Sequence, residues 1–226
     1  MLRWPDVIHQ ACYGIFKLSV KKSKEKENKH KCFVIKICQT TYFELKCINS
    51  IHRFLTEDAT KLCYLLYILS RLDYCNCLLM GAPNSVIQPL QKVQNFAARL
   101  ILMASRHHHC TPLLKKLHWL PISERIKYKV ACMCFHVING SGPTYLSEIL
   151  HIYTPSRKLR SSSDSCMLKI QQYKRKTHGF RTFTYFGPYV WNSLPQDIRQ
   201  CSTPPSFKMN LKTFLFSQYF RSSWLQ

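Results

Sequence analysis

Apolar residues recur every three or four positions over most of the chain, the spacing that lines one face of an α-helix. Residues 37–55 form the first such segment. A second helix is expected after Thr56, whose hydroxyl can cap it, because Glu57 and Asp58 then lie at the positive end of its dipole. This helix would end near the turn at 81–83. The predicted stripes are Ile37, Thr41, Leu45, Ile48, Ile51 and Leu55, followed by Leu62, Leu65, Leu66, Leu69 and Leu72.

Three more helices are predicted between residues 84 and 150. The first opens at Asn84, and its regular part should start close to Pro89, because proline fits only a first helical turn. The next follows Pro121 and stops at Gly140, and a short one begins at Pro143 and ends around residue 150. The stripes of the two longer helices are Leu90, Val93, Ala97, Leu100, Ile101 and Ala104, then Ile122, Ile126, Val130, Met133, Cys134 and Val137.

The pattern changes after residue 151. Residues 153–165 are rich in serine and cations and predict a loop. Residues 171–189 are aromatic and basic, and Gly179 and the Gly187–Pro188 pair indicate turns, so a pair of strands is expected there. Residues 206–219 have helical spacing. The predicted fold class is therefore mainly α, a helical bundle followed by a small irregular, β-containing basic segment and a terminal helix.

The chain is expected to have three parts, at residues 1–35, 36–150 and 151–226. The first contains a lysine-rich run at 21–31 without apolar residues, which cannot bury a face and predicts a disordered arm. A solvated linker is favoured over a nuclear-localisation patch for this run. Trp119 and Trp191, each beside a leucine and close to a proline, are interpreted as anchors that hold turns onto the core.

Charge narrows the range of partners. The 226 residues include 33 Lys+Arg and 11 Asp+Glu, a formal charge of +22. From residue 125 to the end there are fifteen cations and three acids. Such an excess indicates a polyanionic partner, either nucleic acid or an anionic membrane surface. The longest apolar run, 62–69, is far shorter than the roughly 18–20 residues of a membrane span, so no membrane association is expected.

Cysteine usage and the N-terminal residues predict an intracellular protein, nuclear or cytoplasmic. The first 20 residues contain Arg3, Asp6, His9 and Lys17 and lack the apolar core of a secretory leader. The twelve cysteines are therefore expected to be reduced thiols that serve mostly as small core residues.

Two groups of cations are the candidate phosphate-binding residues. One would lie on a single side of the helix that opens at Asn84, where three cations fall seven residues apart. The other combines charge with Tyr173, Phe180 and Phe183, whose rings could stack on unpaired bases. The ten candidates are Lys92, Arg99 and Arg106 in the first group, and Arg157, Lys158, Arg160, Lys174, Arg175, Lys176 and Arg181 in the second.

A series of short motifs occurs in order along the chain. They are FL at 54–55, SRLDYCN at 70–76, LQKVQN at 90–95, AARL at 97–100, LHWLP at 117–121, ERI at 124–126, YTPSR at 153–157, LRS at 159–161 and WNSLP at 191–195. Together they resemble the region downstream of the polymerase core in non-LTR retrotransposon reverse transcriptases of the jockey-like, LINE-type group. The resemblance covers residues 37 to 219, and residues 1–35 show none.

The resemblance implies that the helices at 37–150 look like the thumb, and the segment after it, that grip a template–primer duplex. It also implies what is lacking. Polymerases of this group hold two divalent cations on adjacent aspartates and a third carboxylate, whereas no two aspartates are adjacent here. The endonuclease that such elements carry upstream is not represented either. We therefore expect no enzymatic activity, no cofactor and no small-molecule substrate.

Other chemistry is less favoured. The HHHC run at 107–110 with His118, and the cysteine pairs 75/77 and 132/134, supply ligand types that zinc accepts, but one-residue gaps on helices direct thiols to different sides. Cys134 is interpreted as core, the histidine run as a loop, and no metal site is expected. No cysteine, serine or histidine lies in a recognisable nucleophile motif, and Asp73 is interpreted as a partner of Arg71 or Lys61.

The predicted function is non-catalytic binding of RNA or an RNA–DNA duplex through phosphates, with little sequence preference. Two alternatives remain open. The chain could be a decayed transposon-derived reading frame without a biochemical role, whose helices aggregate for want of the palm they packed against. It could also be a protein-interaction fragment that docks onto a full-length element polymerase.

Overall fold

The structure, a computed structural model, describes residues 23–74, 76–154, 166–171 and 182–222. These residues are mainly α-helical, which confirms the predicted fold class. Within the described ranges the only β-pairing is one antiparallel bridge between Ile152 and Leu168. The chain divides into two compact units, Met1–Ser123 (unit 1) and Glu124–Gln226 (unit 2). The division therefore differs from the predicted boundaries after residues 35 and 150.

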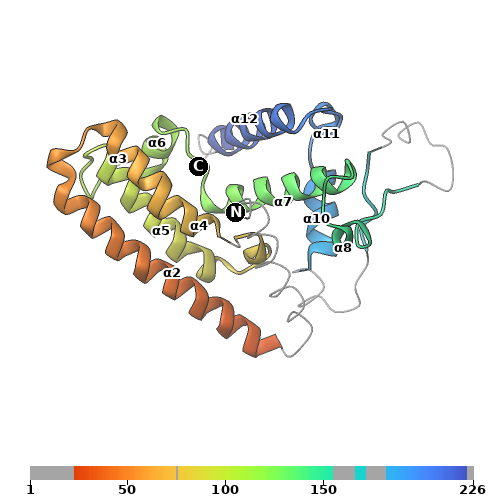
Figure 1. Cartoon of the computed structure of the whole chain (residues 1–226), viewed down its shortest axis with the longest axis horizontal. Helices are drawn as coiled ribbons and strands as arrows, with labels where there is room; N and C mark the ends of the chain where they lie inside the picture. The colour runs from red at the N-terminus through yellow and green to blue at the C-terminus, as the bar shows by residue number, and fades with distance from the viewer. Residues whose placement is uncertain (1–22, 75, 155–165, 172–181, 223–226) are drawn as a thin grey trace, which may run out of the picture. The chain divides into compact units, whose positions relative to one another are not determined.

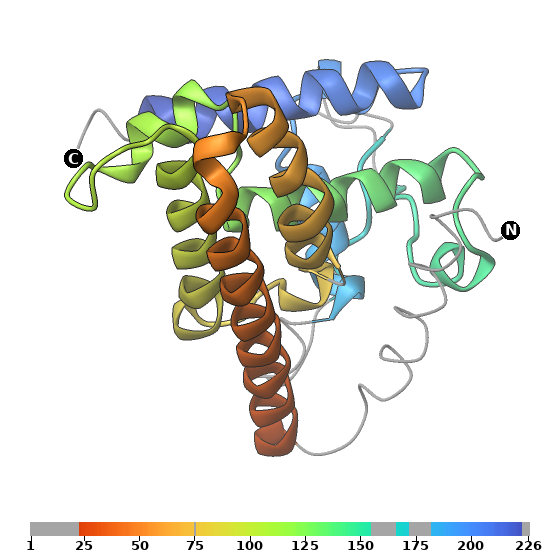
Figure 2. The same ribbon diagram turned by 60° about the vertical axis from the view of Figure 1, so that its left-hand side comes forward.

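The first helix in the described part of unit 1 is α2 (Ser23–Ile51), of 29 residues. The helix starts inside the lysine-rich run, so the described part of the predicted arm is helical, contrary to expectation. One α2 face is buried through Val34, Leu45 and Ile48, and the helix contacts both α5 (Asn84–Ile101) and η3 (Tyr64–Leu69) (Figures 1 and 2). The short η2 (His52–Phe54) closes the first segment.

The second predicted helix runs from Glu57 to Asp73 with a π-helical segment in its middle, and most of the leucines predicted to be buried are exposed, whereas Leu72 is buried. It comprises α3 (Glu57–Cys63), the π-helical η3 and α4 (Ser70–Asp73), followed by the 3-10 helix η4 (Asn76–Leu79). Thr56 caps it as predicted, because its Oγ1 accepts a hydrogen bond from the Ala59 N–H at 3.2 Å. The buried side chains are Thr60, Tyr64, Ile68 and Leu72, whereas Leu62, Leu65 and Leu66 are about half exposed or more.

Two physical causes explain this reversed face. The π-helical turn of η3 advances by i→i+5 hydrogen bonds, which changes the rotation that a 3.6-residue period assumes. Tyr64 is also fixed in the core, because its ring stacks on Trp119 with centroids 4.1 Å apart and planes 17° from parallel. An aromatic pair of this kind favours burial of the Tyr64 side over that of the leucines. Trp119 is thus an anchor, as predicted.

Helix α5 follows its predicted stripe, with Leu90, Val93, Ala97 and Ile101 buried. It begins at Asn84, so Pro89 lies inside the second turn and not close to the start. Gln94 is fully buried and its Nε2 donates to the Leu120 carbonyl at 2.9 Å. The Gln91 Oε1 accepts from the Ile122 N–H, also at 2.9 Å. Gln91 and Gln94 of the LQKVQN motif therefore hold the end of the LHWLP motif and the residue after it in place, which gives these two glutamines a structural role.

Helix α6 (Cys110–Lys116) completes unit 1. The loop before it contains the histidine run, as predicted. Within the described residues, three α-helices are followed by a residue with positive φ, namely Met103 after α5 (49°), His118 after α6 (53°) and Gly140 after α7 (69°). After α5 the Ala104 N–H donates to the Arg99 carbonyl at 2.9 Å, the pattern of a left-handed helix stop.

Unit 2 is built around two antiparallel helices, α7 (Ile122–Ile138), whose first two residues belong to unit 1, and α12 (Pro204–Ser222). Phe135 near the end of α7 stacks on Phe207 near the start of α12 at 4.2 Å, and the two helices run alongside each other in Figures 1 and 2. Helix α7 matches its predicted stripe except for half-buried Met133, α12 covers the residues predicted to be helical, and Gly140 ends α7 as expected. The short helix α8 (Thr144–Ser147) follows Pro143, also as predicted.

The predicted strand pair at 171–189 is wrong in its described part. Residues 183–192 form helix α10 (Phe183–Asn192), which contains both Gly187 and Pro188. A side chain at Gly187 would approach the Cys134 Sγ to 3.3 Å, so this glycine allows close packing and does not mark a turn. The Trp191 Nε1 donates to the Cys166 carbonyl at 2.6 Å, which confirms the second anchor. Helix α11 (Gln196–Arg199) leads into α12.

Candidate nucleic-acid interface

The first predicted group of cations is only partly assembled in unit 1. Lys92 is exposed on α5, whereas Arg99 is half-buried on the same helix. Arg106 is exposed in the loop beyond the end of α5 at Ile101. The prediction that these three cations share one helix side is therefore wrong for Arg106, because the helix stops at the left-handed Met103 before the third repeat.

Arg99 holds the loop that follows its own helix. Its Nη2 donates to the His108 carbonyl at 3.3 Å, and its Nε is buried without a hydrogen-bond partner in the described part of the chain. A guanidinium used in this way has fewer donors left for an external phosphate. Among the three predicted cations of unit 1, Lys92 and Arg106 are thus the better placed for a phosphate contact.

The loop between α5 and α6, together with α6, is a basic surface that the sequence reasoning did not identify as a site. The side chains of Arg106, the three histidines that follow, Lys115 and Lys116 are all exposed. A simple signal could have found it, because residues 74–123 contain no aspartate or glutamate at all. We call this surface, defined by Arg106, His107, His108, His109, Lys115 and Lys116, the α6 surface.

The second predicted group lies outside the described residues. Arg157, Lys158, Arg160, Lys174, Arg175, Lys176 and Arg181, with Tyr173 and Phe180, belong to residues 155–165 and 172–181. Phe183 is described and is 7% exposed within α10. The prediction that Phe183 stacks on bases is therefore wrong, because its ring is used in the core.

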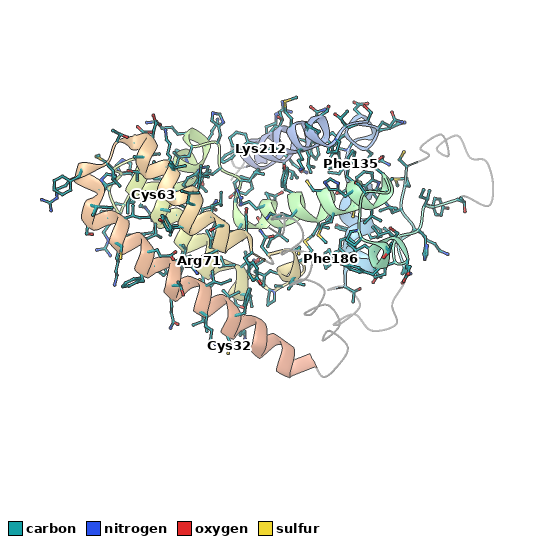
Figure 3. The ribbon with its side chains drawn as sticks, in the orientation of Figure 1. Cys32, Cys63, Arg71, Phe135, Phe186 and Lys212 are labelled. Atoms are coloured by element: carbon teal, nitrogen blue, oxygen red, sulfur yellow. The ribbon has the colours of Figure 1, made fainter. Side chains whose placement is uncertain are left out.

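Helices α7 and α12 place lysines near one another in unit 2. Lys208 and Lys212 are exposed one turn apart on α12 (Figure 3 labels Lys212). Lys208 of α12 and Lys129 of α7 both lie close enough to Cys132 to lower the pKa of its thiol, although burial outweighs them and raises that pKa to about 11. Cations from two helices are therefore neighbours here. We call Lys129, Lys208 and Lys212 the α12 surface.

This α12 surface could also have been predicted. No acid occurs after Asp197, so the lysines of the terminal helix have no acidic residue on their own helix. The nearest carboxylate on α7, Glu124, lies toward the opposite end of α12, where it raises the pKa of Tyr219 after burial, the larger cause. Glu124 is also paired with Lys127, whose Nζ lies 2.8 Å from its Oε1.

Four acids of the described residues, Glu44, Glu57, Asp58 and Glu124, form ion pairs. In unit 1 Arg71 forms an ion pair with Glu44 at 2.6 Å, and the Lys61 Nζ lies 2.9 Å from Glu57 and 3.3 Å from Asp58. Asp73, which was interpreted as a partner of Arg71 or Lys61, accepts a hydrogen bond from the Asn76 Nδ2 at 3.2 Å. The α6 and α12 surfaces consequently keep a local excess of positive charge.

Helix α10 carries three aromatic residues, which follow the second cation group in the sequence. Tyr185, Phe186 and Tyr189 have ring centroids 5.6–6.2 Å apart, and Tyr189 is 52% exposed. They supply the partly exposed rings that Phe183 does not. Sequence reasoning missed them because residues 171–189 were expected to be strands, in which side-chain positions alternate differently.

Histidines and cysteines form no obvious metal centre in the described residues, where no group of three or more potential ligands comes together. Cys134 is fully buried on α7, which confirms its assignment to the core, and burial raises the pKa of its thiol strongly. The ten described cysteines form no disulfide with one another. In the same residues, no helix is long and apolar enough to cross a bilayer.

Comparison with known proteins gives no relative for this chain. No protein-family model, no curated protein and no solved structure matches it.

Proposed function

We propose that this chain is a non-catalytic nucleic-acid-binding module derived from the C-terminal part of a non-LTR retrotransposon reverse transcriptase. In this proposal it binds RNA or an RNA–DNA duplex, through contacts to phosphates with little sequence preference. The ordered series of motifs supports the ancestry, and the lack of adjacent aspartates supports the absence of polymerase activity. The observation that carries the binding function is the exposure of cations in acid-free stretches, namely Arg106, Lys115 and Lys116 of the α6 surface and Lys208 and Lys212 of the α12 surface.

A polyanion is the partner that this arrangement favours. Cations that are exposed without neighbouring carboxylates repel each other, and a phosphate backbone relieves that repulsion while releasing counterions. Sequence-specific readout would require ordered contacts to base edges. The exposed lysines instead offer point charges on flexible stems, which suit phosphates in any sequence context.

The test is a salt titration of RNA affinity by fluorescence anisotropy with the full chain. We expect log K to fall linearly with log salt between about 50 and about 200 mM. The double variant Lys208→Ala/Lys212→Ala should reduce the slope by about 1.4 on a single strand, or about 1.8 on a duplex, if each lysine neutralises one phosphate. Replacement of Lys174, Arg175 and Lys176 by alanine should reduce it further.

Lys61→Ala is the matched control, because this lysine already lies between Glu57 and Asp58 at 2.9 and 3.3 Å. Its removal should leave the slope nearly unchanged. An affinity that does not depend on salt, or no affinity for RNA or DNA, would contradict the proposed function. An equal loss of slope in Lys61→Ala would show that only total charge matters and would remove the α12 surface from it.

A second candidate function is docking onto another protein, such as an intact element polymerase. The specific observation in its favour is the exposed apolar stripe of α3 and η3, with Leu62 at 55%, Leu65 at 47% and Leu66 at 60% exposure. A contiguous apolar surface of this kind usually marks an interface or an aggregation site. Co-purification with the polymerase that is lost in Leu62→Glu/Leu66→Glu would support docking, and concentration-dependent aggregation would instead favour a decayed reading frame.

A further inference from the structure

Helix α10 carries a cluster of three partly exposed rings, Tyr185, Phe186 and Tyr189, which we call the ring shelf. Tyr185 and Tyr189 lie 6.0 Å apart with planes only 11° from parallel. Phe186 meets Tyr189 edge-on at 6.2 Å and 88°. Tyr189 is 52% exposed, whereas the other two are half-buried and support it (Figure 3 labels Phe186). The shelf therefore presents one ring outward on a base of two others.

The opposite side of α10 fixes this orientation. Phe183, Gly187, Val190 and Trp191 are buried there. Two further contacts hold the helix end, because the Asn192 side chain donates to the Leu168 carbonyl at 2.8 Å and accepts from its N–H at 2.9 Å. Rotation of α10 that would bury Tyr189 would break these contacts. The exposed ring is thus held outward by the fold.

An exposed cation lies beside the residues that hold the end of α10. Lys169 follows Leu168, whose backbone N–H and carbonyl are hydrogen-bonded to the Asn192 side chain. In the sequence, residues 165–196 contain five cations and no acid, and Lys169 is the one of these cations that the structure describes. An exposed aromatic ring in such an acid-free, basic setting combines the two elements of a single-strand site, charge for the backbone and a ring for the base.

We propose that the ring shelf stacks an unpaired base of a single-stranded nucleic acid. This inference rests on the proposed nucleic-acid binding and specifies the form of the ligand, because bases in a duplex are already stacked and do not present their faces. Tyr189 takes the base, and Tyr185 and Phe186 hold Tyr189 in place. Base stacking on aromatic rings tolerates any sequence, in agreement with the weak sequence preference expected of the phosphate contacts.

The test compares Tyr189→Ala with the unmodified full chain on a short single-stranded RNA that carries one 2-aminopurine, and on the same RNA annealed to its complement. The loss of stacking should weaken single-strand binding about tenfold and leave the duplex affinity and the salt slope unchanged. Quenching of 2-aminopurine fluorescence, which requires a ring against the base, should disappear. Tyr189→Phe keeps the ring and should restore both readouts. The same oligonucleotide as DNA separates RNA from DNA preference.

Tyr153→Ala is the matched control, because Tyr153 has the same exposure, 51%, in the same unit and makes no ring contact within the described residues. Unchanged circular dichroism will show that each variant is folded. If Tyr189→Ala binds single strands as tightly as the unmodified chain while the salt dependence persists, the shelf is not a base site and the proposed function survives. If the unmodified chain binds no nucleic acid, both proposals fail.

Discussion

At the scale of single residues, the ends of the helices show what sequence could and could not predict. Thr56 and Gly140 were predictable, because a capping hydroxyl and a glycine stop carry known preferences. Met103 and His118 adopt the same left-handed conformation as Gly140, but residues with a Cβ give no such signal. The position of Arg106 was misjudged for this reason, since the stop at Met103 was not foreseen.

Met103 provides a prediction at this scale. It has φ of 49° and is 76% exposed, so its side chain adds little packing while its Cβ opposes the backbone conformation. Met103→Gly should therefore raise the free energy of unfolding by about 1 kcal/mol, measured by urea denaturation. Met103→Ala keeps the Cβ and should give no such gain. Equal stability of the two variants would show that the left-handed position is unstrained.

At the scale of elements, periodicity predicted the helices of α5, α7 and α12 but failed for two segments. Between residues 57 and 73 both sides of the helix are apolar, so the correct face depended on the π-helical turn and on the Tyr64–Trp119 contact, which spans 55 positions of sequence. Residues 183–192 are rich in aromatic and β-branched residues with a Gly–Pro pair. Tertiary packing overrides that local preference, because Gly187 lets α10 approach Cys134 closely.

The reversed face of α3 and η3 gives a paired prediction. Ile68 is fully buried, whereas Leu66 is 60% exposed. Ile68→Ala should lower the free energy of unfolding by about 2–5 kcal/mol through the cavity it leaves, and Leu66→Ala should change it by no more than about 0.5 kcal/mol. Thermal or urea unfolding followed by circular dichroism would measure both. The opposite order would mean that the leucine stripe, as first predicted from the sequence, is the core face.

At the scale of the whole molecule, the net charge of +22 and the acid-free stretches were evident from the sequence, but the meeting of cations from different helices was not. The strongest predicted cations lie outside the described residues, so their clustering stays a prediction. The α6 surface is local in sequence, whereas the α12 surface combines helices that bring distant residues together, such as Lys129 and Lys208 beside Cys132. The division after Ser123 was not predictable either, because α7 runs across it without a break in its pattern.

Salt should have opposite effects on stability and on binding. Added salt screens the repulsion among the cations of the α6 and α12 surfaces, and a gain of about 1 kcal/mol would raise the thermal midpoint by about 2–4 °C for a chain of this size. RNA affinity should fall over the same range. Differential scanning fluorimetry between about 50 and about 200 mM salt would measure the midpoint. The double variant Lys208→Ala/Lys212→Ala should show a weaker dependence of the midpoint on salt than the unmodified chain. A midpoint that falls with salt would indicate that the cations are compensated within the fold.

Each of the two compact units contains one tryptophan within the described residues, so tryptophan fluorescence can follow each unit separately. Trp119 lies against Tyr64 in unit 1, and Trp191 is 1% exposed in unit 2. Trp4 and Trp224 lie outside the described residues and can be replaced by phenylalanine. If Trp119 or Trp191 is then replaced as well, the protein keeps a single tryptophan. The emission of such single-tryptophan proteins would report separately on the melting of each half, without any attached dye. An RNA titration followed in the same way would then reveal which half senses the ligand.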